Sequence, residues 1–229
     1  PGLGRGGGVR LSHQGPAMDL DTAHLFAIAA ALGWASGLRL YAVVFLTGLA
    51  GMLGWVTLPE GLKLLQQPLL LGASGIMLFI EFFADKIPGL DSVWDMAHTV
   101  IRIPAGAMLA AAVFGGDHAS WALIAGLMGG TLAATSHVAK ASTRAAVNTS
   151  PEPFSNIGLS LLGDAAVPAM LWLAWEQPVW FFVALAKQSD EASLRLAGNI
   201  YTTIFRGLPE LLTLFLVYFG VQIMLQKLL

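Results

Sequence analysis

The chain has 229 residues, of which 56% are hydrophobic and only 11% are charged, and its formal net charge is −2. A soluble domain carries roughly 25% charged residues, so this composition excludes a soluble globule and predicts an integral membrane protein. The small net charge argues against nucleic acid as a partner, and the absence of cysteine excludes disulfides and thiolate metal sites.

The first 17 residues are rich in glycine and lack the apolar stretch of a signal peptide. We expect residues 1–17 to form a disordered extension or an expression artefact, and residues 18–229 to form one transmembrane domain. The apolar segment 25–53 that follows is longer than one membrane crossing requires. Ser36 and Gly37 interrupt it and Arg39 comes next, so the sequence predicts a broken or re-entrant first helix.

The rest of the chain alternates apolar and polar segments. An amphipathic stretch at 58–67 comes first, and further spans are expected at 68–84, 91–116, 119–141 and 154–175. Residues 178–206 mix aromatic and charged side chains, which favours an interfacial helix, and 208–228 is the last expected crossing. The sequence therefore predicts an all-α, polytopic membrane protein with about six transmembrane helices.

A short internal similarity suggests two repeated helical hairpins. Pro104 to Leu109 in the third expected span resembles Pro168 to Leu171 in the fifth. If the second and third spans form one hairpin and the fourth and fifth another, both polar loops lie on one side of the membrane and build one site. A chance match of proline and alanine in apolar helices explains the similarity equally well.

Most ionisable groups fall in two blocks, residues 81–102 and 136–156. Helical spacing places Asp91, Asp95, His98 and Arg102 on one face, because they are four, three and four residues apart. Since a lone charge in hydrocarbon is costly, such faces should meet each other or a watery cavity. The candidate substrate-binding residues are Arg39, Arg102, Lys140, Arg144 and Asn148. The candidate proton relays or counter-charges are Glu81, Asp85, Asp91, Asp95, His98 and His137.

Two alternatives apply to these residues. Residues 86–96 and 145–156 are also compatible with solvated loops, whose single charges mark the membrane interface. The histidines and carboxylates also form a pool of ligands for a divalent ion, but ion pairing explains the same residues, so we expect no metal and no other cofactor. No common enzyme motif is present, and catalytic residues cannot be assigned.

The two blocks resemble an uncharacterised multi-pass membrane family, domain of unknown function 4126. The resemblance rests on E-x-x-A-D-K-I-P-x-x-D-x-x-W-D followed by H-T-x-I-R, and on H-x-x-K-A-x-x-R-x-x-x-N-x-S-P-E-P-x-S-N. It spans roughly residues 30–176. Gly163-Asp164 stands where the family suggests an acidic pair, which leaves the role of Asp164 open. The resemblance implies a multi-pass membrane protein and supplies no activity.

The leading functional hypothesis is a small transporter or lipid-translocating protein that recognises an anionic or phosphate-bearing group through its buried cations. The alternatives are a membrane-embedded hydrolase of a lipid phosphate and a structural or assembly subunit of a larger membrane complex. The expected partners are membrane lipids, an anionic small molecule or lipid headgroup, and further copies or subunits. We expect the protein in a bacterial inner membrane. Counts of lysine and arginine favour an orientation with the N-terminus and loops 85–96 and 142–156 in the cytoplasm.

Overall fold

The computed structural model describes residues 20–87, 89–115, 118–148 and 153–188, and every regular element in these ranges is helical. The elements are α1 (Thr22–Met52), the 3₁₀ helix η1 (Glu60–Gln66), α2 (Pro68–Ala84), α3 (Leu90–Ala112), α4 (Ala119–Asn148), α5 (Pro153–Glu176) and α6 (Pro178–Gln188). The expected span at 208–228 and residues 189–206 of the expected interfacial helix lie outside these ranges.

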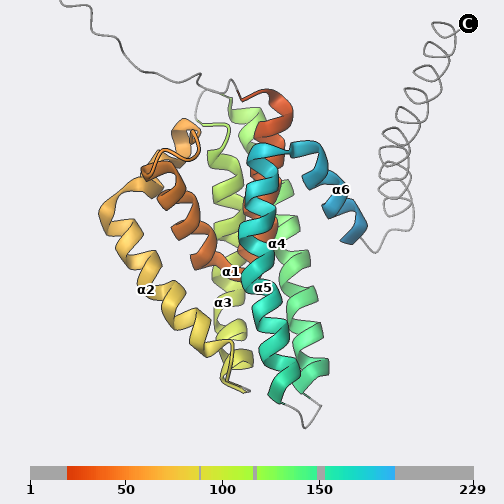
Figure 1. The fold of residues 1–229 in the computed structure, drawn as a ribbon. Helices are drawn as coiled ribbons and strands as arrows, with labels where there is room; N and C mark the ends of the chain where they lie inside the picture. Colours follow the sequence, from red (N-terminus) through yellow and green to blue (C-terminus); the bar gives the residue numbers. More distant parts are fainter. Residues whose placement is uncertain (1–19, 88, 116–117, 149–152, 189–229) are drawn as a thin grey trace, which may run out of the picture.

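Helix α1 is broken at Arg39, whose φ of −149° and ψ of 83° are not helical. The two halves on either side of Arg39 run in opposite directions, so that α1 begins and ends at the same end of the bundle (Figure 1). The predicted broken or re-entrant first helix is therefore present, in its re-entrant form. Its tip, at Arg39, lies inside the bundle.

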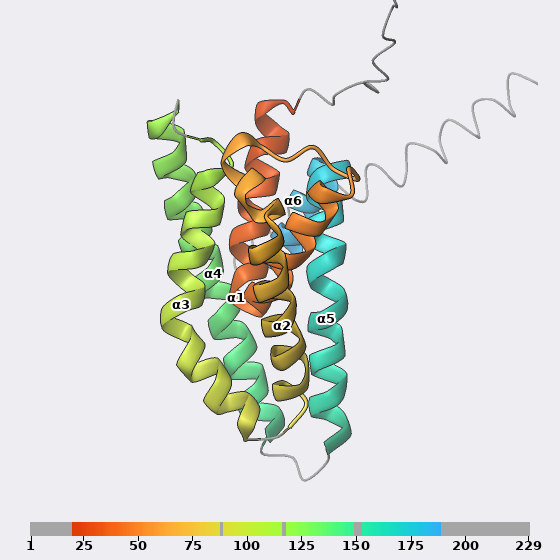
Figure 2. The same ribbon diagram turned by 90° about the vertical axis from the view of Figure 1, so that its left-hand side faces the viewer.

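Helices α2, α3, α4 and α5 run along the bundle in alternating directions, and Figure 2 shows them around α1. We call the end where α2 meets α3 the polar-turn end, and the end where α1 begins the α1 end. By length and composition α1, α4 and α5 are apolar enough to cross a membrane, and η1 with α2 forms a fourth candidate that is bent by 70°. The chain is thus an all-helical, membrane-embedded protein, with fewer candidate spans in the described residues than the six expected.

The exposed surface of the bundle supports this assignment. Large apolar side chains such as Leu69, Ile76, Phe79, Val100 and Leu127 are more than half exposed. Outward apolar side chains and inward charged ones are the arrangement that hydrocarbon favours. Accordingly, the buried face of α3 carries its charged residues Asp91, Asp95 and Arg102.

Small residues bring the helices together at the α1 end. Ala27, Ile28, Ala29 and Ala31 in the first half of α1 have no exposed surface. A Cβ atom on Gly33 would lie only 2.5 Å from the Cα of Gly129 in α4. Such close backbone approach is how membrane helices gain packing energy without a hydrophobic drive between them.

One boundary prediction was wrong. Helix α4 was expected to end at residue 141, but it continues to Asn148. Helix α3 begins at Leu90, within one residue of the expected start, so residues 90–96 and 142–148 are helical and the solvated-loop alternative does not apply to them. Gly89, with φ of 87°, turns the chain directly into α3. The charged side chains of both helices gain ion-pair partners inside the bundle, which removes the need for solvation.

The predicted sidedness is also corrected. A single first span would place the N-terminus and the two polar loops on one side, but α1 turns back at Arg39 and begins at the end opposite the polar turn (Figure 1). The predicted hairpins are not confirmed as packing units, because α3 packs mainly on α4 and α1, and α5 mainly on α1. The end of α2 and the end of α4 do lie at one end of the bundle, as the hairpin hypothesis required.

Candidate functional site

The tip of re-entrant α1 is held by ion pairs. The Arg39 guanidinium is only 2% exposed, and its two terminal nitrogens lie 2.9 Å from Asp85 and 2.9 Å from Asp164. It also donates to the carbonyl of Ser160 at 3.1 Å and to the Ser160 hydroxyl at 3.0 Å. Arg39 therefore joins the break in α1 to the end of α2 and to α5.

Two carboxylates connect the remaining helices. Asp85 accepts from Lys140 at 3.3 Å and from Arg144 at 3.0 Å, in addition to its pair with Arg39. Asp95 pairs with Arg102 at 2.6 Å and with Lys140 at 2.9 Å. Lys140 contacts both carboxylates. The charged faces of α3 and α4 and the end of α2 therefore form one connected system of ion pairs.

The deepest pair in this system joins α2 to α3. Glu81 and Arg102 have fully buried side chains, and Oε1 of Glu81 lies 2.7 Å from a terminal nitrogen of Arg102. The other carboxylate oxygen, Oε2, has no hydrogen-bond partner among the described residues. Removing either member would leave its partner charged and buried, a situation that costs several kcal/mol.

The whole system, which we call the charge network, is formally neutral. Its carboxylates are Glu81, Asp85, Asp91, Asp95 and Asp164, and its cations are Arg39, Lys86, Arg102, Lys140 and Arg144. Each charge has at least one opposite charge within 4.0 Å. This balance explains how so many ionised groups are tolerated inside an apolar bundle.

Polar side chains of α4 also satisfy the backbone at the break. Lys140 donates to the carbonyl of Leu38 at 3.1 Å, and the Ser136 hydroxyl donates to the carbonyl of Trp34 at 2.7 Å. An interrupted helix frees carbonyls that water cannot reach in a bilayer, so it persists only where other groups bond them. The polar residues of α4 thus stabilise the re-entrant geometry.

A cavity of about 580 Å³ opens beside the charge network, between α1, α4 and α5. Three network cations line it, Arg39, Lys140 and Arg144. The lining hydroxyls belong to Thr135, Ser136, Thr143 and Ser160. A second cavity of about 300 Å³ lies against α3 and α4 and includes Asp95, Thr99, His137 and Arg144. Arg144 lines both cavities, so it lies between them.

The two histidines lie beside the charge network. The Nε2 atom of His98 lies 3.1 Å from the Tyr41 hydroxyl, and its Nδ1 atom lies 2.8 Å from the carbonyl of Trp94. The Nε2 atom of His137 lies 2.8 Å from the Thr99 hydroxyl. Both rings are therefore held by neutral groups, and neither forms an ion pair with a network carboxylate.

The structure brings together most of the residues that the sequence selects. Arg39, Glu81, Asp85, Asp91, Asp95, Arg102, Lys140 and Arg144 all belong to the charge network. Asn148 ends α4, and its side chain lies outside the described part of the chain. Among the described residues, no group of three or more histidines and carboxylates is arranged to hold a metal ion.

The contacts of Lys86 and Asp164 were not assigned from the sequence. Lys86 pairs with Asp164 at 3.1 Å, and its amine lies 3.4 Å from the Ser160 hydroxyl. Asp164 follows Ser160 by four residues, which places both on one face of a helix and is a signal that the sequence contained. Lys86 was treated only as an interface charge, although its amine also lies over the Phe82 ring.

Comparison with known proteins gives a family match that covers most of the chain. The family described as "Domain of unknown function (DUF4126)" matches residues 26–187. A stretch of 37 residues is 62% identical to the nopaline transport system permease protein NocQ of Agrobacterium fabrum, and it covers 16% of this chain and 16% of that protein. No solved structure matches this one.

Proposed function

The chain belongs to the DUF4126 family, and on that premise we propose that it is a small membrane transporter or lipid-translocating protein for an anionic or phosphate-bearing substrate. The observation that carries the proposal is the break of α1 at Arg39, inside the bundle and on the wall of the 580 Å³ cavity. In many transporters, half-helices that meet within the membrane bind the substrate at their ends. The short match to a transport permease is consistent with transport and is too short to carry the proposal.

The chemistry of the cavity favours an anion. Arg39 and Arg144 offer planar, multiple donors that suit phosphate, and Lys140 adds a point charge. Ser136 of α4 and Ser160 of α5 also line the cavity. A substrate anion would compete for donors that Asp85, Asp95 and Asp164 occupy in this structure.

Because the charge network is neutral, the proposed transport of an anion requires that a compensating charge enter with it. An anion that enters a neutral, buried network leaves it with an excess negative charge, which is costly in a low-dielectric interior. A proton taken up by a network carboxylate restores neutrality. Glu81 is suited to this role because its Oε2 atom is buried and has no hydrogen-bond partner among the described residues.

The proposal includes the finer topology. We place the protein in a bacterial inner membrane with about six crossings, the polar-turn end in the cytoplasm, and the re-entrant tip of α1 reached from that end. Lysine and arginine enrichment near the polar turns supports this orientation. Assembly into a homo-oligomer or a larger membrane complex is compatible with the same topology.

The balanced charges also favour a second candidate, a structural or assembly subunit. In the described residues every network charge is paired internally, which is sufficient to hold α1 in place without any substrate. This candidate predicts that the folded protein moves no solute or lipid by itself. A flux measurement therefore separates the two functions.

The test is flux in vesicles that contain the purified protein. Two probes are used, inorganic phosphate trapped inside and a fluorescent phosphatidic acid whose movement between leaflets is followed by chemical quenching. We expect flux of one probe, and its loss by tenfold or more in Lys140→Gln, because one charge-assisted hydrogen bond is worth roughly 1.5–3 kcal/mol. The control is Lys63→Gln, which removes an exposed lysine paired only with Glu60. Absence of flux of both probes by folded protein would support the structural candidate.

A further inference from the structure

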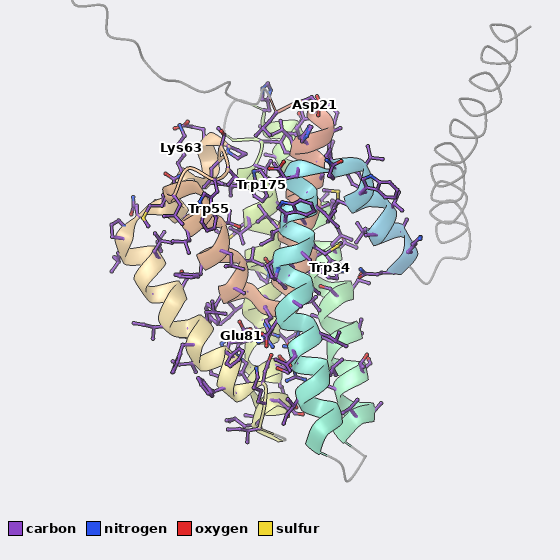
Figure 3. The ribbon with its side chains drawn as sticks, viewed as in Figure 1. Asp21, Trp34, Trp55, Lys63, Glu81 and Trp175 are labelled. Atoms are coloured by element: carbon purple, nitrogen blue, oxygen red, sulfur yellow. The ribbon has the colours of Figure 1, made fainter. Side chains whose placement is uncertain are left out.

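The cavity beside the charge network has one side that the described helices leave open. It lies between α1, α4 and α5, and α4 and α5 make little contact with each other. Gln188, where α6 ends, also lines it, and α6 lies beside the α1-end half of the bundle (Figure 1). Figure 3 shows Trp34, on the cavity wall, between Trp175 near the α1 end and Glu81 toward the polar-turn end. In the described part of the chain, the groove between α4 and α5 is therefore uncovered beyond Gln188.

The residues along this groove are small or apolar, and they are exposed. Thr135, Ala139 and Thr143 follow one another at four-residue spacing on α4, and all three line the cavity and are exposed. Leu162 of α5 lines the cavity from the other side and is 69% exposed. We call these four residues the open face. Membrane helices pack on one another through small residues and hydroxyls, so the open face has the composition of a helix-packing surface.

Contact of the open face with lipid would be unfavourable. Behind it lie the network cations Arg39, Lys140 and Arg144, and charged side chains within a membrane face protein or water rather than hydrocarbon. Acyl chains that entered the cavity would lie against charged groups and hydroxyls without hydrogen bonding to them, which is costly. The matching partner is a helix that is apolar toward lipid and polar toward the cavity.

The chain contains a segment with this pattern. Residues 189–229 follow α6, and their apolar stretch 208–228 is long enough to cross a membrane. On a helix, Tyr218, Gln222 and Gln226 would share one face, because each is four residues from the next. That polar stripe covers about 12 Å of helix, the same length as the stripe from Thr135 to Thr143.

The hydrogen-bonding groups of the two stripes are complementary. The hydroxyls of Thr135 and Thr143 donate to carbonyls of their own helix, so each oxygen can still accept a hydrogen bond. Glutamine amides and a tyrosine hydroxyl supply donors. We propose that residues 208–228 form a transmembrane helix that packs on the open face, with Tyr218, Gln222 and Gln226 toward the cavity. Residues 189–207 extend up to about 3.3 Å each, which is enough to reach either end of the bundle from Gln188.

This proposal does not depend on the transport function, because it requires only that the bundle is embedded in lipid. The packed helix separates the cavity from hydrocarbon and leaves it accessible from the polar-turn end. The charged and hydroxyl groups of the lining then face protein and water. A negative result in the flux assay would leave the proposal unaffected.

The test is disulfide crosslinking in membranes, since the chain contains no cysteine. Ala139→Cys, on the open face, is combined with a second cysteine placed at each position from 214 to 226 in turn. A disulfide requires Cα atoms about 4.4–6.8 Å apart, so only neighbouring positions react. We expect crosslinks within one chain at positions that recur every three to four residues, on the face that carries Tyr218 and Gln222.

The matched control is Val138→Cys, which is adjacent in α4, is 61% exposed and does not line the cavity. With the same series of second cysteines it should give about tenfold less crosslinked product, because its side chain leaves α4 in another direction. Equal yields from positions 138 and 139, or no product from position 139 with any partner in folded protein, would overturn the proposal.

A second experiment excludes another copy of the chain as the occupant. Proteins that carry Ala139→Cys alone and Gln222→Cys alone are mixed in the same membranes before oxidation. We expect crosslinking within the double-cysteine chain to exceed this mixed dimer about tenfold or more, because the proposed contact lies within one molecule. A mixed dimer as the main product would show that a second copy covers the open face, and would contradict the proposal.

Discussion

The two ends of the bundle hold the same helix by different means. At the α1 end, alanines and glycines of the first half of α1 contact α3 and α4 directly, with Gly33 against Gly129. Toward the polar-turn end, the tip of α1 is held by Arg39 and its carboxylate partners. Lipid supplies no hydrophobic drive between helices, so close packing and polar pairing hold them together. The cavity that Arg39, Lys140 and Arg144 line adjoins the charged end. Close packing therefore holds the first half of α1, and ion pairs hold its tip.

Arg102→Met should destabilise the folded protein more than the other substitutions, because it disrupts the ion pairs of the charged end. Among the described residues, Arg102 is the one cation that pairs with Glu81, so the substitution leaves Glu81 without an ion-pair partner and removes one of the partners of Asp95. Removing one member of a buried pair costs about 3–5 kcal/mol, so we expect a loss of folded protein or a large fall in stability. Unfolding by sodium dodecyl sulfate, followed by circular dichroism, measures the change.

A neutralising double substitution should recover part of that loss. Glu81→Gln combined with Arg102→Met removes one charge of each sign and keeps the network balanced. We expect a coupling energy of about 1–3 kcal/mol between the two positions in a double-mutant cycle. Simple addition of the two single effects would mean that the pair is not coupled, and the charged end would need a different explanation.

Gly33→Ala should disrupt the close packing of α1 against α4 without changing any charge. The added Cβ would lie 2.5 Å from the Cα of Gly129, so the backbones of α1 and α4 must separate. We expect a destabilisation of about 1–3 kcal/mol by the same unfolding measurement. The matched control is Gly72→Ala in α2, where an added Cβ meets nothing within 4 Å and a helical alanine is favoured. Equal effects of both changes would show that close approach does not matter.

Sequence analysis predicts much of this difference between the two ends. The spacing of Asp95 and Arg102 on α3, and of Lys140 and Arg144 on α4, places charges on single helix faces, and those faces meet in the structure. The pattern of apolar residues also predicts where most helices begin and end, to within a few residues. Such signals are local, because they depend only on the periodicity of one helix.

Other features depend on contacts between distant segments and were not predictable. The break at Arg39 was expected, but no local pattern shows whether the chain continues across the membrane or turns back. The pair of Lys86 with Asp164 depends on α5 lying beside the end of α2.

The smallest effect is expected at the start of α1, where one exposed charge caps the closely packed end. Asp21 accepts a hydrogen bond from the backbone nitrogen of His24 at 2.8 Å, and this bond holds the pKa of Asp21 below its ordinary value of 3.8. Because the folded-state pKa is lowered, the cap contributes fully above about pH 4 and is lost as pH falls through the folded value. The hydrogen-exchange protection factor of the first turn of α1, which corrects for the slower intrinsic exchange in acid, should fall on acidification. Asp21→Asn, which keeps a capping side chain, should remove that dependence.

The proposed transport requires that the 580 Å³ cavity beside the charge network be open to water. Cysteine labelling tests this requirement most directly, since the chain contains no cysteine. Thr135 lines the 580 Å³ cavity, whereas Val138 lies nearer to the polar-turn end, is 61% exposed and does not line it. In vesicles, Thr135→Cys should react with a membrane-impermeant thiosulfonate and Val138→Cys should not. Reaction at position 138 with none at 135 would show that depth alone controls labelling and that the cavity is closed to water, which contradicts the proposed site.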